Sequence, residues 1–108
     1  EYGSAAAIKD KFPVSDGHLL IVPKRHTADY FSLTEIEKAD TDRLIEICRK
    51  RISEKDPTIT GFNIGMNNGK DAGQTIFHCH IHLIPRRKGD VDNPRGGVRG
   101  IIPSKQSY

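Results

Sequence analysis

The chain has 108 residues, with 17 lysines and arginines against 14 aspartates and glutamates, a net charge of +3, and 35% hydrophobic residues. This length predicts a single domain, residues 1–108, with one modest core. No apolar run approaches the roughly 20 residues of a membrane span, and the two cysteines are too few for a disulfide or zinc framework. Because residues 1–4 lack a charged and then hydrophobic signal region, we expect a cytoplasmic protein.

Two short strands are predicted near the start of the chain, over Ala5–Ile8 and His18–Val22. Between them lie Pro13 and the sequence Ser15-Asp16-Gly17. These are turn residues, because proline fixes φ and glycine accepts positive φ. We therefore expect two strands joined by a loop, with Pro23 ending the second.

A long helix is predicted over residues 35–54. It begins at Thr34-Glu35-Ile36-Glu37, where the threonine hydroxyl caps the first turn and Glu37 reaches back to the cap. Asp56-Pro57 ends it, since the residue before proline disfavours helical backbone. Apolar residues recur at helical spacing and predict a helix that covers the sheet: Ile36, Leu44, Ile47, Cys48 and Ile52.

A third strand is predicted where Phe62, Ile64 and Met66 alternate with polar or small residues. A glycine-containing loop over residues 68–73 follows, and then a fourth strand over about residues 75–84. Residues 89–104 hold four glycines and two prolines without periodicity, so we expect an irregular tail lying over the body.

The excess positive charge is located in residues 86–108, which carry six basic and two acidic side chains. This tail suits a phosphate-bearing ligand or a solvated flank about equally well. In the first case, guanidinium groups bind the polyphosphate of a substrate through Arg86, Arg87, Arg95 and Arg99.

Three of the five histidines fall within His78-Cys79-His80-Ile81-His82-Leu83-Ile84-Pro85. Because side chains on a strand alternate between its two faces, these histidines share one face. Cys79, Ile81 and Leu83 then point to the other face. The pattern predicts that one face of the strand packs in the core while the other carries chemistry.

The residues alone leave three interpretations of the histidine face open: a polar solvent face, a metal site, or nucleophilic catalysis at phosphorus. Two histidines at i and i+2 can chelate one ion, and His18 or Asp10 would complete that site. All three cannot easily converge, since His78 and His82 are roughly 13 Å apart at about 3.3 Å per residue. In the catalytic interpretation, the central imidazole attacks phosphorus while its neighbours fix its tautomer and stabilise charge.

The pattern His-x-His-x-His followed by two hydrophobic residues resembles the signature of the histidine triad (HIT) superfamily of nucleotide hydrolases and transferases. The resemblance covers roughly residues 5–90 and includes the upstream segments Asn67–Thr75, Asp10–Pro13 and Gly17–Lys24. The sequence Pro85-Arg86-Arg87-Lys88-Gly89-Asp90 after the triad resembles the Fhit-like and bacterial dinucleoside-polyphosphate-hydrolase branch.

The resemblance implies an α+β fold with a five-stranded, mainly antiparallel sheet, one long helix packed on it, and a homodimer. It also implies hydrolysis of phosphoanhydrides, as in diadenosine tetraphosphate, through a nucleotidyl-histidine intermediate. This chemistry requires no cofactor, although a divalent cation can accompany the polyphosphate. The alternatives are a Hint-like phosphoramidase or nucleotidyl transferase, and a nucleotide-sensing module. Each has a nucleotide as its ligand, and we expect neither a nucleic acid nor a membrane partner.

By the same resemblance, His80 is the nucleophile, and His78 and His82 are the flanking triad members. Gln74 corresponds to a glutamine that contacts the phosphate region. The residues expected to bind the nucleotide are Asp10 at the ribose, His18 at the end of the first hairpin, Asn67 and Thr75 near the phosphates, and Ile8 and Leu20 at the base. No residue is assigned to a metal.

Overall fold

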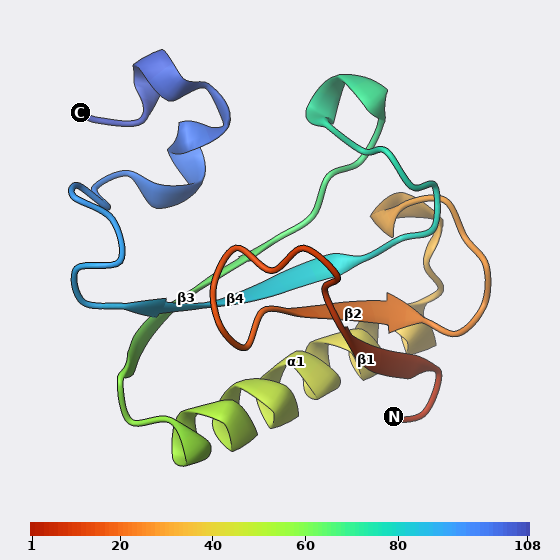
Figure 1. Cartoon of the computed structure of the whole chain (residues 1–108). Helices are drawn as coiled ribbons and strands as arrows, with labels where there is room; N and C mark the ends of the chain where they lie inside the picture. Colours follow the sequence, from red (N-terminus) through yellow and green to blue (C-terminus); the bar gives the residue numbers. More distant parts are fainter.

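The computed structural model describes all 108 residues. One antiparallel sheet has the strand order β1-β2-β4-β3, and a single long helix lies across one of its faces (Figure 1). The strands are β1 (Ala5–Lys9), β2 (Leu19–Pro23), β3 (Ile59–Gly65) and β4 (Ile81–Arg87), and the helix is α1 (Glu35–Lys55). The α+β fold is confirmed. None of the helices is long and apolar enough to cross a membrane.

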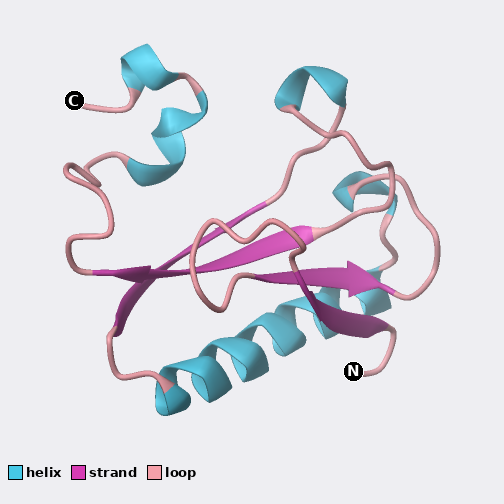
Figure 2. Ribbon diagram, viewed as in Figure 1, coloured by secondary structure: helices cyan, strands magenta, loops and turns pink.

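The sheet has four strands, so the expectation of five is wrong (Figure 2). The residues before β1 do not add a strand, because Tyr2 and Ala5 form a single bridge across a turn. Gly3 supplies the positive φ of +54° at this turn. The chain therefore folds back on the start of β1.

The core lies between α1 and the sheet. Ile21, Ile81 and Leu83 of the two central strands are almost completely buried, and they pack with Leu44 and Cys48 of the helix. Full burial of one such aliphatic side chain contributes about 1.5–3 kcal/mol. Because these side chains occupy the helix side of the sheet, the opposite side of β4 is open for other functions.

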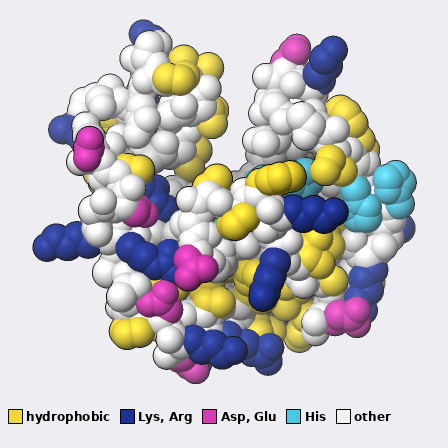
Figure 3. All heavy atoms as spheres, in the orientation of Figure 1, with side chains coloured by type: hydrophobic (Ala, Val, Ile, Leu, Met, Phe, Trp, Pro, Cys, Tyr) yellow, Lys and Arg dark blue, Asp and Glu magenta, His cyan; other side chains and the backbone are white.

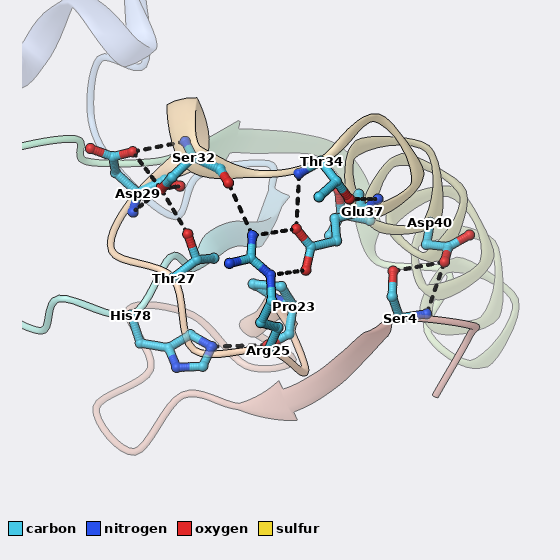
Figure 4. Close-up of polar contacts among 11 residues, drawn as sticks. Ser4, Pro23, Arg25, Thr27, Asp29, Ser32, Thr34, Glu37, Asp40 and His78 are labelled. Atoms are coloured by element: carbon cyan, nitrogen blue, oxygen red, sulfur yellow. Dashed lines mark hydrogen bonds and ion pairs between the residues drawn. The ribbon is translucent and has the colours of Figure 1, made fainter.

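The start of α1 confirms the predicted capping box, with Thr34 and Glu37 bonding to each other's amides at 3.1 and 2.9 Å. Arg25, two residues after β2, donates two more hydrogen bonds to the Glu37 carboxylate (Figure 4). Mainly through Arg25, the pKa of Glu37 falls to about 2. The expectation that Ile36 faces the sheet is wrong: it is 71% exposed, while the paired Glu37 is buried in that turn.

The predicted strand over residues 75–84 is wrong at both ends, because β4 begins at Ile81 and continues to Arg87. The residues before Ile81 pair with no strand. Their polar groups bond instead to the loop of residues 24–34, where Cys79 N–H donates to Thr27 O. At the other end, Pro85 lies beyond the residues of β4 that pair with β2, and here β4 pairs with β3 alone. Proline has no N–H to donate, but no carbonyl group of β2 needs one at this position.

The loop of residues 24–34 is fastened to three other parts of the chain. Arg25 joins it to α1, and the Tyr30 amide donates to Asn68 Oδ1 at 2.9 Å. The Thr27 carbonyl accepts from the Cys79 amide between the histidines, and the Ala28 carbonyl accepts from the Gln74 side chain. This loop, together with the start of β4, therefore fixes where the histidines lie.

The chain after β4 contains two short 3₁₀ helices, η3 (Gly97–Ile101) and η4 (Pro103–Lys105), and no further strand. The four arginines expected to bind polyphosphate, two at the end of β4 and two beyond it, are engaged within the chain. Arg86 pairs with Asp90 and Arg87 with Asp56, each at 2.8 Å. Two others stack on the C-terminal tyrosine ring, namely Arg95 and Arg99. These contacts disfavour the polyphosphate-binding role expected for the four arginines.

Candidate active site

The histidines gather at the end of the sheet where β4 begins. His82 lies within β4, His80 directly precedes it, and His78 lies in the bend before that. The rings of His80 and His82 meet edge to face, with centroids 5.3 Å apart. Cys79 is buried between the histidines, as the alternation predicted. Burial raises the pKa of its thiol, so this cysteine is a packing residue and a poor nucleophile.

The ring of His80 is oriented by the main chain. Its Nδ1 lies 2.9 Å from the carbonyl oxygen of His78. A carbonyl only accepts, so Nδ1 carries the proton and Nε2 keeps a free lone pair. His80 therefore has the tautomer that a nucleophile attacking through Nε2 requires.

The ring of His78 is anchored by its own contacts at the end of β2 (Figure 4). Its Nε2 donates to the carbonyl oxygen of Pro23 at 2.9 Å. Its Nδ1 is then an acceptor, and it lies 3.3 Å from Nδ1 of His26. His26 is exposed and lies directly against this triad ring, a contact that the sequence analysis did not predict. The only signal was its place three residues after a strand that pairs with β4.

A hydrogen-bonded chain fixes the tautomer of His82. The Val14 amide donates to His18 Nδ1 at 3.2 Å, so the proton of His18 is on Nε2. That Nε2–H donates to His82 Nδ1 at 2.9 Å, which places the proton of His82 on its own Nε2. Burial, with the neighbouring His18 and His80 rings, lowers the pKa of His82. His82 is thus a neutral donor at pH 7.

Asp10 lies beside this chain. Its Oδ2 is 3.4 Å from His18 Nε2 and 3.9 Å from His82 Nδ1, while Oδ1 accepts from the Phe12 amide. The ligand atoms of Asp10, His18 and His82 all lie within 4.8 Å of one another, which is close enough to share a metal ion. The donor set fits a metal poorly, however. His18 Nε2 carries a proton, and moving it to Nδ1 would oppose it to the Val14 N–H.

An apolar cavity of about 230 Å³ opens beside His80. His78 and His80 form one wall of it, and Ile8 and Leu20 form part of the rest, together with Val22 and Ile76. The two aliphatic residues expected at the base therefore lie beside the expected nucleophile. A flat, uncharged ring fits such a lining.

The remaining predicted residues separate into three environments. Gln74 is buried, and its amide bonds only to the main chain, at Gly69, Ala28 and Ile76. These bonds shape the loop of residues 69–76. Thr75 is exposed. Asn67 lines a second cavity, which also touches His82.

The chain is similar to several known proteins. A family model of the HIT domain matches residues 1–89. The nitrilase and fragile histidine triad fusion protein NitFhit of Caenorhabditis elegans is 44% identical over 81 residues, which cover 72% of this chain and 18% of that protein. The bis(5′-nucleosyl)-tetraphosphatase (asymmetrical) of Schizosaccharomyces pombe is 39% identical over 88 residues, covering 80% of this chain and 47% of that protein.

The likeness extends to three dimensions. The crystal structure of a HIT family protein from Bacillus anthracis superposes with a TM-score of 0.78 at 37% identity, covering 83% of this chain and 63% of that one. This chain therefore spans less than two thirds of each of these three proteins.

Proposed function

Because the chain belongs to the HIT domain family, we propose that it is a nucleotide hydrolase that cleaves the phosphoanhydride bonds of dinucleoside polyphosphates through a nucleotidyl intermediate on His80. The observation that carries this proposal is the tautomer of His80. Its Nδ1 is committed to the His78 carbonyl, which leaves Nε2 free, and its ring lines an apolar cavity that suits a nucleobase. The similarity to a bis(5′-nucleosyl)-tetraphosphatase supports the choice of substrate class.

In the first step, His80 Nε2 forms a bond to the phosphorus of the bound nucleotide. The bond from that phosphorus to the leaving oxygen breaks, and the leaving nucleotide departs with the electron pair. The nucleotidyl imidazole is then a cation. Its Nδ1–H donates to the His78 carbonyl, an interaction that strengthens as positive charge develops on the ring.

His82 stabilises the charge that develops on phosphorus or on the leaving oxygen. Its Nε2 carries a proton because His18 holds Nδ1 as an acceptor. A neutral donor fixed in orientation before the reaction costs no reorganisation when the charge appears. In the second step, a water oxygen bonds to phosphorus, the bond to His80 Nε2 breaks, and the mononucleotide is released with one proton lost to solvent.

The test is rapid quenching of the protein with labelled diadenosine tetraphosphate, followed by mapping of an acid-labile adduct to His80. We expect His80→Ala to lower kcat by about 10⁴-fold or more, since the nucleophile is removed. Its affinity for AMP should remain, because the apolar cavity persists. Cys48→Ala is the matched control, since Cys48 packs in the core and its loss should affect stability more than chemistry.

Two results would overturn the proposal. One is retained turnover in His80→Ala. The other is loss of activity on chelation with recovery on added zinc, which would favour metal chemistry. Transfer of the labelled nucleotide to added phosphate or to an amine, in preference to water, would indicate a transferase that uses the same intermediate.

A further inference from the structure

A second cavity, of about 390 Å³, lies on the other side of His82 from the apolar cavity. Its floor is formed by β3 and β4, through Asn63 and Ile84 as well as His82. Its far wall is η3 of the tail, through Val98 and Ile101. Figure 3 shows it as an open cleft between the tail and the loop that follows β3.

The tail wall is fixed in place by side chains of the sheet. Arg86 donates to both carboxylate oxygens of Asp90 at 2.8 Å, and also to Asn63 Oδ1 at 2.7 Å. Gly97 approaches so closely that an added Cβ would lie 3.4 Å from Asn63 Nδ2. The turn at Asp90 is therefore held by β4, and the start of η3 lies close against β3. The tail forms a defined wall of the cleft.

The lining of this cleft contains no lysine, arginine, aspartate or glutamate. Val98 and Ile101 are 59% and 78% exposed, although both are aliphatic. Their neighbours in the lining include two amides, Asn63 and Asn67. Because Arg86 occupies Asn63 Oδ1, the Asn63 amide group presents its Nδ2 as a donor. Uncharged aliphatic walls with a few amide donors suit a neutral ring with acceptor atoms better than a phosphate chain.

We propose that this second cleft binds the nucleoside of the leaving nucleotide, so that the two halves of a dinucleoside polyphosphate occupy opposite sides of the His80–His82 pair. The inference rests on the proposed function, and it concerns which leaving groups are accepted. His80 lines the first cavity and His82 the second. Their touching rings mark the point where the polyphosphate crosses. The aliphatic residues of the tail then determine which leaving groups are accepted, while its arginines stabilise the conformation of the tail.

The test compares two substrates that share AMP as the transferred group. Diadenosine triphosphate has a nucleotide as leaving group, whereas adenosine 5′-phosphoramidate loses only ammonia. We expect Ile101→Asp to lower the ratio of kcat/KM for the first substrate over the second by about tenfold, the scale of a lost apolar pocket contact. Ile102→Asp is the matched control. It is the next residue, 56% exposed and outside the cleft lining, and it should leave the ratio unchanged.

A binding measurement separates this inference from the proposed function. In a His80→Ala background, Ile101→Asp should weaken binding of diadenosine triphosphate by about tenfold while leaving AMP binding within twofold of the parent, since AMP fills only the first cavity. Equal affinities for diadenosine triphosphate with and without Ile101→Asp would overturn the second cleft as a nucleoside site. If the wild type releases AMP from neither substrate, the proposed function fails, and the binding comparison still decides the role of the cleft.

Discussion

Replacing His18 by phenylalanine tests whether the hydrogen-bonded chain from Val14 to His82 controls the reaction. The side chain of His18 is only 4% exposed, and phenylalanine keeps a flat ring of similar size at this position. The substitution removes both ring nitrogens. It therefore leaves the Val14 amide without its acceptor and His82 Nδ1 without its donor.

The expected magnitude follows from these two bonds. A net hydrogen bond contributes about 0.5–1.5 kcal/mol, and a partly buried group left unpaired costs about 1–3 kcal/mol. We therefore expect the free energy of unfolding to fall by about 2 kcal/mol, and Tm by about 10 °C for a domain of this size. Without the His18 donor, His82 can protonate either nitrogen. The loss of a supporting hydrogen bond of this kind lowers activity by about 10–100-fold. We expect most of this effect as a fall in kcat, with a smaller change in KM.

The assay combines kinetics with ¹⁵N NMR of the histidine rings. In the wild type, His82 should show a protonated Nε2 and an unprotonated Nδ1, and in His18→Phe the two tautomers should mix. His26→Phe is the matched control. It removes the contact of another histidine pair, the exposed one with His78, and should leave the His82 tautomer unchanged.

An unchanged His82 tautomer in His18→Phe, with kcat preserved and only Tm lowered, would refute this reasoning. His18 would then be a packing residue of the hairpin. Loss of activity without any change in the His82 spectrum would also refute it. His18 would then act on the substrate directly and not through His82.

Acid unfolding should reveal the Arg25–Glu37 pair. The pKa of Glu37 is about 2 in the fold against an ordinary 4.5, so its contribution is complete above pH 4.5 and is lost as the pH falls towards 2. Arg25→Gln should flatten the dependence of stability on pH in that window, as measured by urea unfolding. Leu83→Ala should lower the free energy of unfolding by about 2–5 kcal/mol, because the side chain is fully buried, and calorimetry should show a matching fall in Tm. Sedimentation at micromolar concentration should show a homodimer, since β3 is an open sheet edge and its Ile64 is 49% exposed beside α1. Ile64→Asp should then give monomers, whereas a monomeric wild type would contradict the dimer.

Features that depend on neighbouring residues could be predicted from the sequence. The capping box at Thr34 and the burial of Cys79, Ile81 and Leu83 follow from local spacing, and both are present. The start of β4 could not be predicted in this way. Alternation continues through residues 78–80, but their main-chain groups bond to the loop of residues 24–34 and to a histidine side chain. A sequence pattern does not show which partner a buried amide will find.

The same limit applies to the candidate site. The three triad histidines and the aliphatic wall at Ile8 and Leu20 could be selected from the chain. The structure places His78 and His80 at one cavity with that wall, and the ring of His82 against that of His80. The position of His26 and the second cleft could not be found, because they depend on contacts between distant residues. The start of η3, for example, lies beside Asn63 of β3, where a Cβ added at Gly97 would be 3.4 Å from Asn63 Nδ2. The charge count of the tail could not distinguish a phosphate site from a solvated flank, because it does not show the partners of the arginines.

The fastening of the loop of residues 24–34 has a consequence for hydrogen exchange. The segment that carries the proposed nucleophile is held by this loop and not by a ladder of strand bonds, with Thr27 accepting from the Cys79 amide at 2.7 Å. Local opening of this region therefore need not involve unfolding of the sheet. The Cys79 amide should exchange together with amides of the loop, and separately from those of β4. Substitutions in the loop that contact no substrate would then change how often the site is assembled, while the sheet keeps its protection.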